Sequence, residues 1–271
     1  MKKILVPTDF SEQSTIALKT AAQIALKWDA EIYLLHIIDL PNVNSFNGIN
    51  ADIPEVILFK KLAEQRLNEY KNNEILKNIK FQVHLKLMKT FEGINQVALD
   101  NNVDIIIIGS NGASGIKEVT IGSNTEKVVR TSTIPVLVIK GKNVNHNFKN
   151  IVFASDFEQN NKNNFYKAVE FSKLFDSNLH LLYINTPTNF TTTSYITSKI
   201  KEFEVNYPNI TFSIYNDYTI EKGIVNYNNT NNIDLTIINT HGRKGIAHFL
   251  NGSISEDLVN HSERPILTYK I

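Results

Sequence analysis

The sequence predicts an α/β protein made of two tandem copies of one unit, each with a five-stranded parallel sheet. The stretch "ILVPTDF" (4–10) matches "IVFASDF" (151–157), and "VDIIIIGSNGASG" (103–115) matches "IDLTIINTHGRKG" (233–245). Such self-similarity indicates an internal repeat. Within each copy, short apolar runs alternate with stretches of helical periodicity, which is typical of strands joined by helical crossovers.

In the first copy, each expected element follows from the local pattern. Residues 4–6 read as a short buried strand, and Ser11 is suited to cap the helix that follows. Pro54 suits the first turn of a second helix, expected over 54–70. The apolar face of that helix is expected to contain Val56, Phe59, Ala63 and Leu67. The β-branched run at 104–109 indicates a strand buried on both faces. The remaining expected elements are strands at 32–38, 81–88 and 135–140, and helices at 91–99 and 120–131.

The second copy repeats this order with a shorter middle. Matching positions lie 147 residues apart up to the second strand (Ile4 with Ile151) and 130 apart from the fourth strand onward (Gly109 with Asn239). We expect domains at 1–140 and 151–271, joined by a polar linker at 141–150 that lacks hydrophobic periodicity. The expected strands of the second copy lie near 151–155, 179–184, 210–215, 234–239 and 265–269.

Composition narrows the class of protein. The net charge is +1, which argues against a nucleic-acid partner, and no apolar run approaches the roughly 18 residues of a membrane helix. Pro7 interrupts the N-terminal apolar run too early for a signal peptide, so a cytoplasmic location is expected. There is no cysteine, and the seven histidines form no ligand pair, so we expect no metal site made by protein groups alone. We find no catalytic constellation.

Ligands of open α/β sheets bind beyond the carboxyl ends of the strands, and distinctive residues stand there. Asp9 follows the first strand, Ile37 stands near the end of the second, and the loop at 109–123 follows the fourth. Glycines such as Gly112 let backbone N–H groups approach a ligand, and Gly122 opens a helix whose first N–H groups suit an anion. The sequence therefore predicts a phosphate cradle, with ordinary turn glycines and a helix cap as the alternative reading.

These residues resemble the universal stress protein family in a tandem two-domain form. The resemblance rests on "ILVPTDFS", "LLHIID" and the Gly-x2-Gly-x9-Gly-Ser spacing within "IGSNGASGIKEVTIGSNTEKVVRTSTIPVLVIK". It implies a Rossmann-like fold of the adenine nucleotide alpha hydrolase kind. It also implies a site for ATP, or for ADP or AMP, with Mg²⁺ held through the phosphates. The implied nucleotide-binding residues are Pro7, Thr8, Asp9, Ile37, Gly109, Gly112, Gly122, Ser123, Asn124 and Thr125.

In the second copy, the glycine spacing departs from the family pattern only where Asn239 replaces the first glycine. Asparagine tolerates a left-handed backbone, so the loop is expected to survive, with an amide that crowds the nucleoside. Arg243 is either a phosphate contact or part of a solvated loop tip. We expect the first copy to be the better ATP site. The candidate residues of the second site are Asp156, Ile184, Asn239, Gly242, Arg243, Gly252, Ser253 and Ser255.

The resemblance also implies that the last strands of the two copies pair as an intramolecular pseudo-dimer, and that the chain forms homodimers. The leading hypothesis is a cytoplasmic stress-response protein that binds ATP as a regulator or sensor, mainly through the first copy. One alternative is a module for dimerisation and partner contact with vestigial nucleotide sites. The other is a slow ATPase, which the lack of a catalytic constellation disfavours.

Overall fold

The computed structural model describes residues 2–39, 54–110, 121–141, 147–203, 207–240, 258–259 and 262–271. The chain divides into two compact units, Met1–Val144 and Asn145–Ile271. We call them the first and second unit. The division falls inside the expected linker, but that stretch is not wholly a surface connection. Phe148 is fully buried and packs on Phe171 and Phe175, with ring centroids 5.9 and 5.0 Å away, because an aromatic ring gains more by joining the core.

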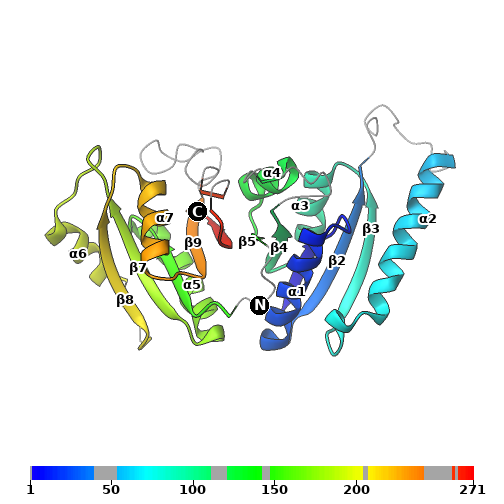
Figure 1. Ribbon diagram of the computed structural model, residues 1–271, viewed down its shortest axis with the longest axis horizontal. Coiled ribbons are helices and arrows are strands. Elements are labelled where there is room, and N and C mark those ends of the chain that lie inside the picture. The colour runs from blue at the N-terminus through cyan, green and yellow to red at the C-terminus, as the bar shows by residue number, and fades with distance from the viewer. Residues whose placement is uncertain are drawn as a thin grey trace. The chain divides into compact units, whose positions relative to one another are not determined.

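The first unit is a parallel sheet with strand order β3-β2-β1-β4-β5. Its strands are β1 (Lys3–Pro7), β2 (Glu31–Ile38), β3 (Phe81–Leu87), β4 (Ile105–Gly109) and β5 (Val136–Ile139) (Figure 1). Its α-helices are α1 (Glu12–Trp28), α2 (Pro54–Glu69), α3 (Thr90–Asp100) and α4 (Ser123–Thr131), with short 3₁₀ turns η2 (Tyr70–Asn72) and η3 (Glu74–Leu76). The α/β class expected from the sequence is confirmed.

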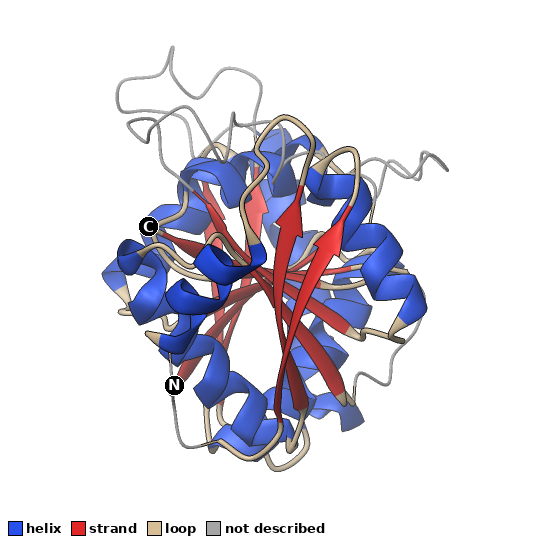
Figure 2. Ribbon diagram, turned by 90° about the vertical axis from the view of Figure 1, so that its left-hand side faces the viewer, coloured by secondary structure: helices blue, strands red, loops and turns tan. Residues whose placement is uncertain are grey.

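The second unit repeats the arrangement, with parallel strands in the order β8-β7-β6-β9-β10. The strands are β6 (Asn150–Ala154), β7 (Asn178–Asn185), β8 (Ile210–Asn216), β9 (Leu235–Thr240) and β10 (Ile266–Lys270). The described helices are α5 (Lys162–Phe175), preceded by η4 (Gln159–Asn161), and α6 (Thr193–Lys201) and α7 (Ile220–Thr230). Figure 2 shows the strands in red and the helices in blue that cover them.

Local chemistry explains most of the element boundaries. Ser11 caps α1 by accepting a hydrogen bond from the Ser14 N–H, and α1 ends at Asp29 in a left-handed conformation (φ 51°). All five residues of β4 are buried, as its continuous apolar run predicts. The helix α4 begins at Ser123, three residues later than the expected start at 120. The expected core position Phe59 is wrong, since its side chain is 51% exposed on α2.

The narrow buried face of α2 accounts for that error. Val56, Ala63 and Leu67 are buried. At 3.6 residues per turn, their side chains leave the helix axis within a sector of about 40°. Phe59 lies about 60° away from Val56 on that helix. Because α2 packs on β2 and the edge strand β3, its contact stripe is too narrow to include this ring. No helix in the described ranges is both long enough and apolar enough to cross a membrane.

Candidate functional site

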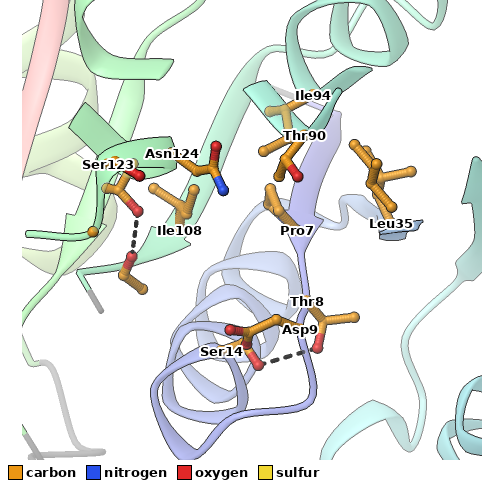
Figure 3. A pocket seen from close by; sticks show the side chains of 14 residues that line it. Pro7, Thr8, Asp9, Ser14, Leu35, Thr90, Ile94, Ile108, Ser123 and Asn124 are labelled. Carbon is orange, nitrogen blue, oxygen red and sulfur yellow. Dashed lines mark hydrogen bonds between the residues drawn. The ribbon is translucent and has the colours of Figure 1, made fainter. Parts of the chain in front are cut away.

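A cavity of about 240 Å³ lies in the first unit at the carboxyl ends of β1, β2 and β4, where the strand order reverses (Figure 3). This is the position at which open α/β sheets bind ligands. Nine of the ten residues expected to bind nucleotide line it. They are Pro7, Thr8, Asp9, Ile37, Gly109, Gly122, Ser123, Asn124 and Thr125. The tenth, Gly112, lies outside the described residues.

The turn after β1 presents Asp9 to this cavity. The Asp9 carboxylate Oδ1 accepts a hydrogen bond from the Ser11 N–H at 3.0 Å, and the Thr8 hydroxyl accepts one from the Phe10 N–H at 3.1 Å. Such side-chain-to-backbone bonds two residues ahead are the usual way in which Asp and Thr hold a tight turn. The Thr8 hydroxyl also lies 3.1 Å from that of Ser14, and a dashed line marks this bond in Figure 3. Asp9 itself is exposed.

His36 supports the same turn from β2. Its Nδ1 lies 2.7 Å from the Thr8 carbonyl oxygen, so Nδ1 is the nitrogen that donates. Its ring packs on Phe10 with centroids 4.4 Å apart. Burial lowers the pKa of His36 below its ordinary value, against the opposing effect of the bond to Thr8. His36 therefore orients the backbone that carries Asp9.

The opposite wall of the cavity is the start of α4. Gly122 is the N-cap, and having no side chain it leaves the first N–H groups of the helix without a side-chain cap. Ser123 and Asn124 are exposed beside it and line the cavity (Figure 3). Unpaired N–H groups and the positive end of the helix dipole favour an anion at this wall.

Thr125 has a different role from the two residues before it. Its side chain is buried, and its hydroxyl donates to the Gly109 carbonyl oxygen at 2.9 Å. A hydroxyl has one proton to donate, so this bond leaves Thr125 no donor for a phosphate. Thr125 instead ties the first turn of α4 to the end of β4, which fixes the distance between two walls of the cavity.

Gly109 is required by a close approach of backbones rather than by its own dihedral angles. It ends β4 and is not among the residues with positive φ. A Cβ placed on Gly109 would lie 2.9 Å from the carbonyl oxygen of Gln13 in α1. Any side chain there would therefore push away the first turn of α1.

Five lining residues did not emerge from sequence reasoning, namely Ser14, Leu35, Thr90, Ile94 and Ile108. Thr90 stands where α3 begins after β3, so the same carboxyl-end argument identifies it. Its N–H and hydroxyl both bond to the Asp39 carboxylate, at 3.0 and 2.9 Å. Ser14 and Ile94 have no local signal, because they reach the cavity from helix positions that only the packing of α1 and α3 specifies.

In the second unit, Asp156 follows β6 as Asp9 follows β1, and Ile184 is buried in β7. Asp156 is half-buried, and desolvation raises the pKa of its carboxyl. Its Oδ1 accepts hydrogen bonds from the Glu158 N–H at 3.1 Å and from the Asn161 side-chain amide. The aspartate of the second unit is thus bonded to the start of the neighbouring helix.

Asn239 is not placed as the sequence suggested. It lies within β9 without a positive φ, so a left-handed backbone is not the reason for asparagine. Its Oδ1 accepts a hydrogen bond from the Asn164 amide of α5 at 2.9 Å, and the side chain is buried. The amide oxygen is therefore bonded to α5, while the expectation that this side chain crowds the nucleoside stays a prediction.

The remaining candidates of the second site lie outside the described residues, namely Gly242, Arg243, Gly252, Ser253 and Ser255. Among the residues that the structure does describe, no group of three or more His, Asp or Glu side chains is placed to hold a metal ion.

One protein-family model and several curated proteins match the sequence of this chain. The model of the Universal stress protein family matches residues 1–140 and 214–270. The universal stress protein MJ0577 of Methanocaldococcus jannaschii is 38% identical over 156 residues, which cover 52% of this chain and 96% of that relative. A second protein of the same organism, MJ0531, is 30% identical over 148 residues, covering 51% of this chain and 82% of the relative.

Among the solved structures that match the chain over nearly its whole length are two universal stress proteins. A universal stress protein from Archaeoglobus fulgidus DSM 4304 has a TM-score of 0.75 at 24% identity, covering 99% of this chain and 96% of its own. A putative universal stress protein from Pseudomonas aeruginosa UCBPP-PA14 has a TM-score of 0.67 at 16% identity, covering 100% and 93%. At these identities the likeness supports the two-unit fold.

Proposed function

The chain belongs to the universal stress protein family, and we propose that it binds an adenine nucleotide, ATP foremost, in the cavity of the first unit. In this proposal the nucleotide makes the protein a cytoplasmic regulator or sensor in a stress response. The observation that carries it is the cavity at the strand-order reversal, lined by Asp9 on one side and the start of α4 on the other.

The lining suits the two ends of a nucleotide. Pro7, Leu35, Ile37 and Ile108 supply apolar surface for a base, as small-molecule sites commonly do. Asp9 supplies an acceptor for ribose hydroxyls. The N–H groups of the first turn of α4, from Ser123 onward, supply donors for phosphate oxygens together with the Ser123 hydroxyl. In this proposal the base contacts apolar side chains, the ribose contacts an acceptor, and the phosphates contact donors.

A divalent cation fits this site only as a companion of the phosphates. Mg²⁺ is usually held in proteins by one or two carboxylates together with substrate phosphates and water. Asp9 is the one carboxylate that lines the cavity within the described residues, with hydroxyls and backbone groups around it. In our proposal Mg²⁺ arrives with ATP.

We also propose that the last strands of the two units pair with each other, as in a dimer. Formation of homodimers by the whole chain is a further expectation.

Calorimetry on the full-length chain tests the proposal. Titration with ATP and Mg²⁺, and with ADP, AMP and cyclic AMP separately, measures affinity and the number of sites. We expect saturable ATP binding that Gly122→Val weakens at least tenfold, about 1.4 kcal/mol, because two methyl groups project into the phosphate wall. The φ of −62° at Gly122 is compatible with valine, so the variant should fold.

A matched pair of carboxylate variants locates the nucleoside end. Asp9→Asn should weaken ATP binding, whereas Glu12→Gln should not, because Glu12 is exposed nearby but does not line the cavity. Absence of binding by any nucleotide would leave the interaction-module hypothesis in place. Repeated turnovers of ATP hydrolysis, abolished by Gly122→Val, would instead favour the slow ATPase.

A further inference from the structure

The two units build the turn that carries the aspartate in the same way. In the first unit the Asp9 Oδ1 accepts from the Ser11 N–H at 3.0 Å, and in the second the Asp156 Oδ1 accepts from the Glu158 N–H at 3.1 Å. The turns therefore start from equivalent backbone geometry, and any difference in how the two carboxylates are used comes from the side chains around them.

The first difference is at matching positions 14 and 161. Asn161 donates its side-chain N–H to the Asp156 Oδ1, across the start of α5. The Ser14 hydroxyl is instead bonded to the Ser11 carbonyl oxygen at 3.0 Å and lies 3.1 Å from the Thr8 hydroxyl. A serine side chain ends one atom beyond Cβ, whereas an asparagine amide nitrogen lies one bond farther and reaches the carboxylate.

A second difference is that the turn in the second unit is linked to α6. The Lys199 ammonium forms an ion pair with the Glu158 carboxylate, and the Gln159 amide bonds to the Glu202 carboxylate just after α6. Glu158 and Gln159 both follow Asp156 in the chain. Through them the turn that follows Asp156 is bonded to α6 at Lys199 and to Glu202 just after it.

The bond from Asn161 to Asp156 leaves other hydrogen bonds of Asn161 unmade. Asn161 is the N-cap of α5, yet its side chain makes no capping hydrogen bond. Its Oδ1 is buried with no hydrogen-bond partner within the described part of the chain. An N-cap asparagine normally uses that oxygen to accept a helix N–H. Here the amide is turned so that its N–H bonds to Asp156, and a charge-assisted bond of this kind is stronger than a neutral one.

We propose that positions 14 and 161 determine which unit presents its first-strand aspartate to a nucleotide. With serine at 14, Asp9 lines the cavity; with asparagine at 161, Asp156 is held at the start of α5. The inference rests on the proposed nucleotide site and adds a specificity-determining residue to it. The proposed preference for the first unit then follows from this side chain in addition to the change from Gly109 to Asn239.

The test exchanges the two residues in the full-length chain. Ser14→Asn should lower the pKa of Asp9, followed by its carboxyl ¹³C NMR signal, because an amide N–H bonded to the carboxylate favours the charged form. The same variant should weaken ATP binding about tenfold in calorimetry. Ser14→Ala is the matched control: it removes the hydroxyl without adding an amide, and it should change ATP affinity less than Ser14→Asn.

The reciprocal variant is measured with the first site weakened. In a Gly122→Val background, Asn161→Ser should add a second saturable ATP site beside the weakened first one. This variant is expected to fold, because serine is a favourable N-cap and the buried Oδ1 is removed. An unchanged pKa of Asp9 in Ser14→Asn would overturn the inference whether or not any nucleotide binds. Equal losses of affinity in Ser14→Ala and Ser14→Asn would overturn it too, while no ATP binding by the unaltered chain would refute the proposed function instead.

Discussion

The first and second units share strand order and the turn after the first strand, yet the side chains around that turn differ. In the first unit Asp9 is exposed at a cavity, and Gly109 lets α1 approach β4 closely. In the second unit Asp156 is bonded to Asn161, and Asn239 is bonded to Asn164. Polar side chains of the second unit therefore bond at positions 156, 161 and 239, which match the cavity-lining residues Asp9, Ser14 and Gly109 of the first.

Two of these asparagines replace small residues together. Asn239 matches Gly109, and Asn164 matches Ala17 of α1 under the same repeat. The larger side chain at the end of β9 points at the helix and finds a hydrogen-bond partner there, at 2.9 Å. A buried acceptor needs such a partner, so the Asn239 Oδ1 and the Asn164 amide are coupled physically. The Asn239 Nδ2 is buried with no hydrogen-bond partner within the described part of the chain. The departure from the glycine pattern is thus accommodated by the helix.

The largest expected effect on stability comes from placing asparagine, the residue of the second unit at position 239, at the matching position 109 of the first unit. Gly109→Asn places a Cβ against the Gln13 carbonyl oxygen, a backbone atom that cannot move cheaply. We expect a loss of about 2 kcal/mol in the free energy of unfolding, within the range for overpacked cores, and weaker ATP binding. Chemical denaturation measures the first quantity and calorimetry the second.

A control for Gly109→Asn is the same substitution at Gly141, an exposed glycine with φ 70°. Asparagine tolerates that conformation, so Gly141→Asn should cost clearly less. Adding Ala17→Asn to Gly109→Asn should recover part of the loss if the first unit can form the amide pair of the second. Equal stability of Gly109→Asn and the unaltered chain would show that α1 does not lie as close as described.

A smaller effect is expected from the reverse change. Asn239→Gly leaves the Asn164 amide with only the Lys270 carbonyl oxygen, 3.2 Å away, so the chain should lose about 1 to 2 kcal/mol. Asn164→Ala with Asn239→Gly should be less destabilising than the sum of the two single variants, which a double-mutant cycle in urea measures. ATP affinity should not rise; a gain in affinity without loss of stability would show that this amide crowds the nucleoside.

The smallest expected effect concerns the charge on Asp156. Desolvation raises the pKa of Asp156 above its unfolded value of 3.8, so the ionised form opposes folding at neutral pH. That opposition disappears as the pH falls through the raised pKa and the carboxyl becomes protonated. Asp156→Asn should therefore stabilise the chain by less than about 1 kcal/mol at pH 7, with the gain shrinking in acid. Thermal melts across that range check the sign, and a stability loss at pH 7 would contradict it.

Much of the fold could be read from local pattern. The run at Ile105–Gly109 is buried on both faces, Ser11 caps α1, and the repeat placed equivalent strands in both halves. Phe59 could not be assigned correctly in this way, because periodicity indicates a helix but not the width of its contact. Phe148 was not identified as a core residue, because the polar residues around it gave no sign of a ring that packs on α5.

The candidate site likewise has features that the sequence predicts and features that depend on tertiary packing. The sequence by itself determined that Asp9, Gly109 and Gly122 follow or precede strands and helices whose ends meet at one edge of a parallel sheet. Only the tertiary structure decided which side chains point into that edge. Thr125 bonds to Gly109, Asn239 bonds to α5, and Asn161 bonds to Asp156. Spacing along the chain fixes where a residue stands, but its hydrogen-bond partners depend on the helix packed against it.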